Sequence, residues 1–211
     1  MRVIAVVSQK GGCGKSTIVR TLAVEAAERD LRVRVADLDL MQGTVTQWNM
    51  RRQLAGRTPT IEVQTYSNVD QARRATEGID LLLFDGAPHA SVQTSQASKG
   101  AQLTVIPTKT TLDDLAAALA LARELVKAGV EPERVLFVLN QTTDSVVEVS
   151  EARQWLLRGG FPTCEAAIAL KTGYSRALDQ GDALQEARHP SLSGRAQMVA
   201  NEIFDYLDAV A

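Results

Sequence analysis

The stretch SQKGGCGKST, residues 8–17, lies between a short apolar run at residues 3–7 and a helical pattern at residues 17–29. A strand, a glycine-rich turn and a helix that opens on Lys-Ser-Thr are typical of a phosphate-binding loop, because backbone N–H groups at a helix N-terminus surround phosphate oxygens. In such a loop Lys15 reaches the β- and γ-phosphates, and the Ser16 hydroxyl ligates Mg²⁺. The sequence therefore predicts a nucleotide site directly after the first strand.

The glycines of this loop allow the backbone to approach an anion without a clash from Cβ. The common pattern G-x-x-x-x-G-K-[ST] requires glycine at position 9, where this chain has Gln9, and a second lysine, Lys10, precedes Lys15. A glycine-rich turn with incidental lysines is the alternative, but the strand before it and the helix after it favour the phosphate loop. The residues predicted to contact the nucleotide here are Gly11, Gly12, Cys13, Gly14, Lys15, Ser16 and Thr17.

Apolar runs of strand length alternate with helical patterns along the whole chain. The runs cover residues 3–7, 33–36, 61–63, 81–84, 103–106, 135–139 and, more weakly, 166–170. The helical patterns between them include residues 17–29, 112–128 and 146–157, and a last helix is expected at roughly 194–210. Near-continuous apolar strands indicate a parallel sheet that is covered on both faces. The predicted fold is α/β, a doubly wound, mostly parallel sheet with helices on both faces, in a single domain spanning residues 1–211. The polar segment 51–59 is predicted to be a surface loop.

Composition excludes several classes of protein. The chain has 211 residues, a formal net charge of −2 and two cysteines, Cys13 and Cys164, which form no C-x-x-C pair. This pattern argues against a zinc site, an iron–sulfur site or a disulfide framework. The apolar run before the glycine-rich loop is too short to predict a signal peptide, and no apolar stretch approaches the length that predicts a membrane span. We therefore expect a cytoplasmic protein.

Carboxylates follow two of the predicted strands. Asp37 and Asp39 end the second strand at alternate positions, and Asp85 ends the strand LLLFD, followed by Gly86 and Pro88. An aspartate at the end of a parallel strand can hold Mg²⁺ through its water shell, because Mg²⁺ keeps several waters and few direct carboxylates. A helix N-cap or turn carboxylate is the alternative for Asp85.

The string KGGCGKST resembles the deviant Walker A motif of the ParA/MinD group of P-loop ATPases. The resemblance implies binding of ATP and Mg²⁺ and an ATP-dependent sandwich homodimer, in which Lys10 reaches the phosphates of the partner's ATP. A lysine supplied in this way neutralises charge on the transferring phosphoryl group. It also implies slow ATP hydrolysis, as in a timer or switch.

Two further segments resemble motifs of the same group. Residues 37–42 resemble its D-x-D-P-Q motif, which implies that Asp39 positions the attacking water and that Asp37 lies near Mg²⁺ or orients Lys10. This chain has Leu40-Met41 where the group commonly has a single proline, a departure that affects the path of the loop. Asp85 resembles the Walker B aspartate and is a predicted Mg²⁺ ligand together with Ser16 and Asp37.

Two other positions carry weaker signals. Thr111 is a predicted N-cap with Asp113 and Asp114 in the first helical turn, a structural role that we favour over a catalytic one. Asn140 ends the strand VLFVLN at the position that reads adenine in the resembling group. A strand-end asparagine in a turn is the alternative.

The choice among branches of this group rests on the rest of the chain. The final helical pattern carries Glu202, Asp205 and Asp208 and no late lysine or arginine, which disfavours anchoring to anionic lipid. The paired cysteines of the iron–sulfur branch are absent. The short ParA type remains, and it implies non-specific DNA binding through Lys and Arg, association with the nucleoid, and a ParB-like or cargo-adaptor partner that stimulates hydrolysis. Lys171 and Arg176 are the first candidates for DNA contact.

Two functions therefore stay open. The first is a dimerising ATPase that uses DNA as a track to segregate or position plasmid, chromosome or protein cargo. The second is an ATP-dependent switch on the same scaffold that recruits a partner protein without binding DNA, which the net negative charge favours slightly.

Overall fold

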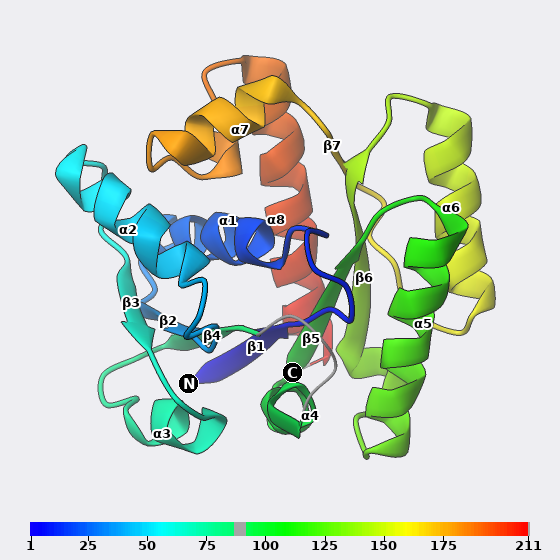
Figure 1. Cartoon of the computed structure of the whole chain (residues 1–211), viewed down its shortest axis with the longest axis horizontal. Coiled ribbons are helices and arrows are strands. Elements are labelled where there is room, and N and C mark those ends of the chain that lie inside the picture. The colour runs from blue at the N-terminus through cyan, green and yellow to red at the C-terminus, as the bar shows by residue number, and fades with distance from the viewer. Residues whose placement is uncertain (87–91, 211) are drawn as a thin grey trace.

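The computed structural model describes residues 1–86 and 92–210. Seven strands form one sheet in the order β3-β2-β4-β1-β5-β6-β7, and every strand pair in it is parallel (Figure 1). The strands are β1 (Arg2–Val6), β2 (Val33–Asp37), β3 (Glu62–Thr65), β4 (Leu81–Asp85), β5 (Leu103–Thr108), β6 (Val135–Thr142) and β7 (Ile168–Ala169). All seven predicted strands are present, and the predicted doubly wound α/β fold is confirmed.

Helices cover both faces of the sheet. They are α1 (Lys15–Glu28), α2 (Thr44–Leu54), α3 (Val69–Arg74), α4 (Val92–Lys99), α5 (Leu112–Lys127), α6 (Val146–Arg158), α7 (Thr172–Asp179) and α8 (Pro190–Val210), with short 3-10 turns η1 (Pro132–Arg134) and η2 (Leu184–Glu186). One apolar core joins the sheet to α1, α2, α7 and α8, and the other joins it to α3, α4, α5 and α6. Figure 1 shows these two groups of helices on opposite sides of the strands. Burial on both faces explains why the inner strands are largely apolar, whereas the edge strand β3 is polar at three of its four positions and mostly exposed.

The predicted start of the 112–128 helix is confirmed. The Thr111 side chain accepts a hydrogen bond from the backbone N–H of Asp114, and Asp113 and Asp114 lie in the first turn of α5. A side-chain cap satisfies one of the N–H groups that a helix N-terminus leaves without a partner, and acidic residues there complement the helix dipole.

The prediction of a surface loop at residues 51–59 is wrong in its first half. Residues 51–54 are the last turn of α2, and the side chain of Arg52 is 1% exposed. Its guanidinium donates two hydrogen bonds to the carboxylate of Glu186, at 2.6 and 2.9 Å, and further bonds to the carbonyls of Pro59 and Gly181. Arginine can be buried when its fixed donors all find acceptors, and local sequence cannot reveal acceptors that lie so far along the chain.

The order of the strands decides where a site can form. The chain moves from β1 outward to β2 and β3, returns to β4, and then crosses to β5 and the other half of the sheet. Loops on either side of such a reversal leave a crevice at the carboxyl ends of the strands. The phosphate loop follows β1 at this point. Within residues 1–86 and 92–210, none of the helices has the length and apolar character needed to cross a bilayer.

Candidate nucleotide-binding site

The loop between β1 and α1 has the backbone of a phosphate loop. Gly12 and Gly14 have φ values of +73° and +91°, and Gly14 is the N-cap of α1 without a side-chain cap. The N–H groups of the first turn of α1 therefore stay available for an anion. A Cβ on Gly11 or Gly12 would meet no atom within 4 Å, so this side of the loop faces open space.

Gly14 is packed against the predicted adenine reader. A Cβ on Gly14 would lie 1.9 Å from Asn140 Nδ2, which donates a hydrogen bond of 2.8 Å to the carbonyl oxygen of Cys13. Asn140 is 1% exposed, and its Oδ1 has no hydrogen-bond partner among the described residues. In this structure Asn140 thus stabilises the phosphate loop through its hydrogen bond to Cys13. A role in reading adenine stays a prediction.

Lys15 is held at the loop by hydroxyl groups. It is buried, and its Nζ donates a hydrogen bond of 3.0 Å to Ser8 Oγ, which in turn donates to the carbonyl oxygen of Lys10. Ser8 is a residue that the sequence reasoning missed, although it lies three positions before the first predicted contact residue, Gly11. The ammonium is fixed without a carboxylate partner in the described part of the chain, so its charge is available to phosphate oxygens.

Ser16 and Asp85 form the pair that a magnesium site needs. Ser16 Oγ donates a hydrogen bond of 2.7 Å to Asp85 Oδ2, while the buried Asp85 Oδ1 has no partner among the described residues. Burial raises the pKa of Asp85 to about 7; the hydrogen bond from Ser16 opposes this shift, and the nearby carboxylate of Asp37 adds to it. A buried carboxylate with one unused oxygen beside a hydroxyl fits a divalent cation, which would stabilise the ionised form.

Asp37, the third predicted metal ligand, has both oxygens occupied by its own chain. It lies opposite Asp85 in the register of β2 and β4. Its Oδ1 accepts from the N–H of Asp39 at 3.1 Å, and its Oδ2 accepts from the N–H and hydroxyl of Thr46 at 3.2 and 2.8 Å. Asp37 therefore ties the loop after β2 to the first turn of α2. Metal ligation by Asp37 stays a prediction.

Asp39 lies in the loop 38–43, which closes one side of the nucleotide cavity. Its Oδ1 accepts hydrogen bonds from the N–H groups of Met41 and Gln42, at 3.2 and 3.0 Å. The cavity has a volume of about 250 Å³ and is lined by Gly11, Gly12, Gly14, Lys15, Ser16, Thr17, Arg20, Asp39, Gln42, Thr44, Gly86 and Gln141. The structure thus brings Asp39 into one cavity with the phosphate loop, although the two are separated by the whole of α1 and β2.

Lys10 lies apart from this cavity. Its Nζ is 3.0 Å from Asp114 Oδ1 at the start of α5, and the side chain of Lys10 is 44% exposed. Burial raises the pKa of Asp114, but hydrogen bonds from Thr111 and Lys10 outweigh this effect and leave it below its usual value. The two lysines of the opening motif therefore point to different surroundings.

Arg20 is a second residue that sequence reasoning missed. It follows Ser16 by one helical turn, is 5% exposed, and lines the cavity. Its guanidinium donates a hydrogen bond of 2.7 Å to the carbonyl oxygen of Thr44 and lies 5.7 Å from the ring centre of Trp48. Burial lowers the pKa of Arg20 to about 10, against the attraction of Asp85. The i, i+4 spacing from Ser16 is the only signal in the sequence that places Arg20 on this face.

The remaining predicted residues lie elsewhere. Lys171 precedes α7 and forms an ion pair with Asp144, and Arg176 lies in the last turn of α7. Neither belongs to the nucleotide cavity. Pro88, noted after Asp85 in the sequence, falls outside the residues that the structure describes.

Comparison with known proteins identifies the family of this chain. A family model described as the CobQ/CobB/MinD/ParA nucleotide binding domain matches residues 4–184. Maintenance of carboxysome distribution protein A from Gloeobacter kilaueensis is 29% identical over 181 residues, which cover 85% of this chain and 82% of that protein. The chromosome-partitioning ATPase Soj from Thermus thermophilus is 28% identical over 193 residues, which cover 76% of this chain and 77% of that protein.

A solved structure has the same fold. The septum site-determining protein MinD from Pyrococcus horikoshii, complexed with Mg-ADP, matches with a TM-score of 0.75 at 16% identity, covering 100% of this chain and 98% of that chain. The family model spans most of the residues that build the cavity, from β1 to η2. The chain belongs to the CobQ/CobB/MinD/ParA family of nucleotide-binding proteins.

Proposed function

We propose that this chain is a Mg²⁺-dependent ATP hydrolase that dimerises when it binds ATP, binds DNA without sequence preference, and segregates or positions a cargo. The nucleotide-binding family and the similarity to Soj, a chromosome-partitioning ATPase, support ATP as the nucleotide. The pairing of Ser16 with Asp85, whose second oxygen is unused, supports Mg²⁺. The cargo is left open, since one similar protein is named for carboxysomes and the other for chromosomes.

Each site residue has a defined task in this proposal. The N–H groups after Gly14 and the ammonium of Lys15 bind the phosphates. Ser16 and Asp85 would hold Mg²⁺, which neutralises charge on the phosphate oxygens. Asp39 orients the attacking water in the cavity; it need not be a strong base, because phosphoryl transfer has a loose transition state.

Lys10 is the single observation that carries the dimer. Lys10 belongs to the phosphate-loop motif but does not line the cavity of its own chain; it reaches outward to Asp114 and its side chain is 44% exposed. A half-exposed cation that lies outside the cavity of its own chain can reach the phosphates bound to a second copy. Exposed apolar side chains near the same edge of the sheet would be covered in such a dimer: Leu40, Met41, Leu112, Val146 and Val147.

The experiment compares Lys10→Ala with Lys127→Ala, an equivalent change at the far end of α5. Light scattering measures the molar mass with ADP, with ATP and with a slowly hydrolysed ATP analogue, and co-sedimentation with plasmid DNA is measured in the same states. We expect parent protein and Lys127→Ala to dimerise and bind DNA only with ATP or the analogue, and Lys10→Ala to do neither while still binding ATP. An ATP-bound Lys10→Ala protein that dimerises like the parent would overturn the proposal.

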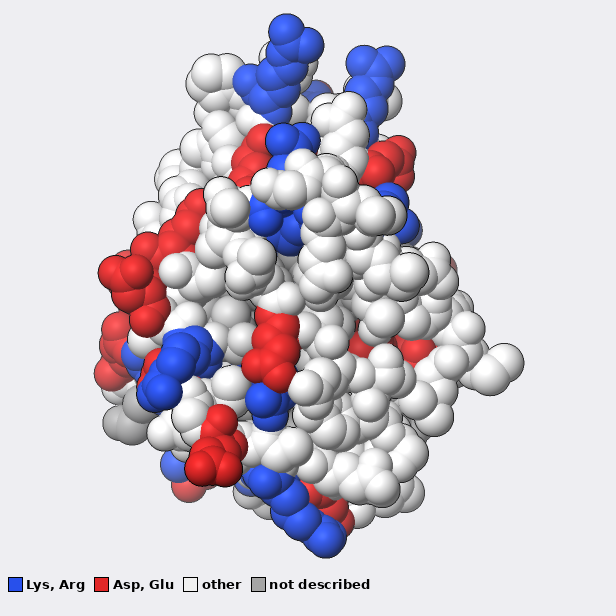
Figure 2. Space-filling model, turned by 90° about the vertical axis from the view of Figure 1, so that its left-hand side faces the viewer, with Lys and Arg blue, Asp and Glu red and all other residues white. Residues whose placement is uncertain are grey.

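DNA contact would come from lysine and arginine side chains on one face of the dimer. Figure 2, which views the side that carries α2, shows basic side chains projecting at the upper end of the molecule and others lower on the same face, interspersed with acidic ones. Arg176 carries a charge that no acidic group among the described residues pairs with, and Lys171 would have to leave Asp144 to reach a phosphate. Strong dependence of DNA binding on salt concentration is expected.

A protein-recruiting switch without DNA binding is the second candidate. Lys171, one of the two candidates for DNA contact, is already in an ion pair with Asp144. If the ATP-bound dimer forms but does not co-sediment with DNA at low salt, this second function replaces the first. A ParB-like or cargo-adaptor protein remains the proposed partner in either case.

A further inference from the structure

A large polar pocket lies outside the nucleotide cavity and shares no residue with it. Its volume is about 780 Å³, within the range of small-molecule sites, and it opens between the segment after α2, helix α7 and the turn before α8. The lining residues are Gly56, Arg57, Thr58, Thr172, Gly173, Arg176, Ala177, Gln180, Asp182, Glu186, Arg188 and His189. We propose that this pocket is a second anion-binding site, which takes the phosphate group of a small phosphorylated molecule.

The two carboxylates of the pocket are already neutralised. Asp182 is paired with Arg57, with Arg57 Nε 2.7 Å from Asp182 Oδ1. Glu186 receives the two hydrogen bonds of the buried Arg52 and a third from the N–H of Ala183. The negative charge of each carboxylate is therefore balanced by a guanidinium group, that of Arg57 or that of Arg52, and repels a bound anion less.

Arg176 and Arg188 supply the excess positive charge. Both side chains are exposed and line the pocket, and neither has an acidic partner or a side-chain hydrogen bond within residues 1–86 and 92–210. His189 adds a third group that can carry positive charge. Guanidinium groups bind phosphate through paired N–H donors, which makes two unpaired arginines in one pocket a fitting receptor for it.

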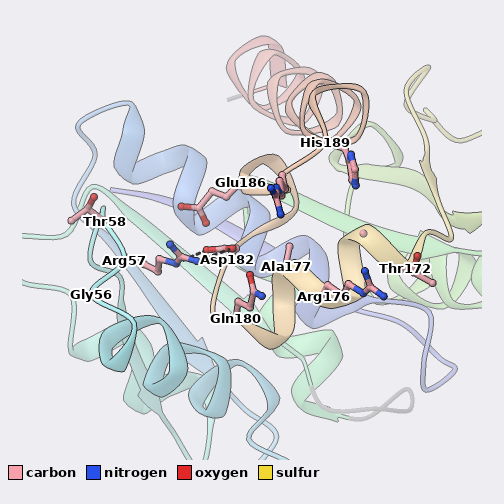
Figure 3. A pocket seen from close by; sticks show the side chains of 12 residues that line it. Gly56, Arg57, Thr58, Thr172, Arg176, Ala177, Gln180, Asp182, Glu186 and His189 are labelled. Atoms are coloured by element: carbon pink, nitrogen blue, oxygen red, sulfur yellow. Dashed lines mark hydrogen bonds and ion pairs between the residues drawn. The ribbon is translucent and has the colours of Figure 1, made fainter.

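The shape of the pocket favours a small molecule over a DNA backbone. In Figure 3, Arg57 and Asp182 lie on the side of the segment after α2, Arg176 and Thr172 lie on the α7 side, and His189 lies above them at the turn before α8. Groups from three segments therefore surround one hollow. A DNA duplex contacts exposed side chains along a surface, whereas a phosphorylated small molecule can enter such a hollow.

Pyrophosphate binding, measured by isothermal titration calorimetry at low salt, tests the proposal. The phosphate loop is first disabled by Lys15→Gln, so that any remaining binding comes from elsewhere. In that background Arg176→Gln plus Arg188→Gln is compared with Arg158→Gln, an exposed arginine at the end of α6 without an ion pair among the described residues. Thermal melting checks the fold of each variant, and Arg188→Gln alone serves if the double variant is unfolded.

We expect the Lys15→Gln protein to bind one pyrophosphate, the pocket variant to bind it at least tenfold more weakly, and Arg158→Gln to leave it unchanged. Equal binding in the pocket variant, or no binding by the Lys15→Gln protein, overturns the proposal. If the pocket variant loses DNA binding while pyrophosphate never binds, the pocket is part of a DNA surface and the small-molecule proposal is wrong. ATP hydrolysis uses the phosphate loop and is measured separately, so failure of this proposal is distinguishable from failure of the proposed function.

Discussion

Asn140 Nδ2 donates a hydrogen bond of 2.8 Å to the carbonyl oxygen of Cys13, and this contact exists because Gly14 has no Cβ. A Cβ at Gly14 would lie 1.9 Å from the same nitrogen. The end of β6 is therefore hydrogen-bonded to the phosphate loop, and this close contact requires glycine at position 14.

Gly14→Ala is expected to displace Asn140 and the loop with it. Gly129→Ala is the matched control, because Gly129 has a similar φ of +98° but no atom within 4 Å of its added Cβ. The backbone strain alone costs about 1–2 kcal/mol, so the control isolates the clash. We expect Gly14→Ala to lose ATP binding and to unfold more easily than Gly129→Ala, as measured with fluorescent ATP and urea. Equal behaviour of the two variants would contradict the packing described here.

Asp85 makes the stability of the metal-free protein depend on pH. Its pKa of about 7 lies above the usual value of 3.8, so the folded chain binds a proton that the unfolded chain has already released. The free energy of unfolding therefore falls as pH rises from about 4 to about 7, by about 1.4 kcal/mol for each unit of pKa difference. The Asp85→Asn variant has no carboxyl group at this position, so its free energy of unfolding should not show this fall with rising pH. We expect the variant to be more stable than the parent at pH 8 and similar to it near pH 4, by urea unfolding without nucleotide or metal.

The same variant provides its own functional check. Asp85→Asn lacks the ionised oxygen that the proposed Mg²⁺ site uses, so Mg²⁺-dependent ATP hydrolysis is expected to be lost while the fold becomes more stable. A variant that is destabilised equally at all pH values would show that the buried carboxylate is ionised in the parent.

Arg52 connects α2 to residues far along the chain and is expected to be a main determinant of stability. Arg52→Met leaves the carboxylate of Glu186 without its guanidinium partner. Breaking a fully buried pair costs about 3–5 kcal/mol, and we expect a smaller loss here because the side chain of Glu186 is 19% exposed. Arg51→Met is the control, since Arg51 is the neighbouring residue and has no ion pair among the described residues. Adding Glu186→Gln to Arg52→Met should recover part of the loss, as measured by thermal unfolding. No recovery would show that packing of the side chain, rather than its charge, is what matters.

Arg20 is expected to act as a positioning residue between α1 and α2. Arg20→Met removes the donor to the carbonyl of Thr44, and loss of a charge-assisted hydrogen bond, worth about 1.5 kcal/mol, corresponds to about tenfold in rate. We expect kcat for ATP to fall by about that factor with a smaller change in KM, and Arg20→Lys to restore part of it.

The fluorescence of Trp48 can be used to monitor the position of Arg20. In a Trp155→Phe background it is the one remaining tryptophan, and Arg20 lies 5.7 Å from its ring centre. The change of Trp48 fluorescence on addition of ATP should be altered in Arg20→Met and unaltered in Arg123→Met, an exposed position on α5. An unchanged kcat and an unchanged signal would rule out this coupling.

Much of the fold could be predicted because its signals are local. The near-continuous apolar runs, the glycine-rich turn and the capping residue Thr111 each depend on a few neighbouring residues, and all are found where expected. The short helices α2, α3 and α4 were missed, because their polar or brief patterns acquire a buried face only against the sheet. The start of the polar segment 51–59 was misplaced for the same reason.

By itself, the sequence determined the parallel sheet, the phosphate loop and the carboxylates at the ends of β2 and β4, since strand periodicity and turn chemistry are set by adjacent residues. Only the tertiary structure decided which of those groups are free to act. In the folded chain both oxygens of Asp37 accept hydrogen bonds, whereas one oxygen of Asp85 has no partner among the described residues. Arg52 is buried and bonded to Glu186, which lies 134 positions away in the sequence. Charge and hydrogen-bond partners are chosen by packing across the whole chain, and they decide which side chains remain available to a ligand.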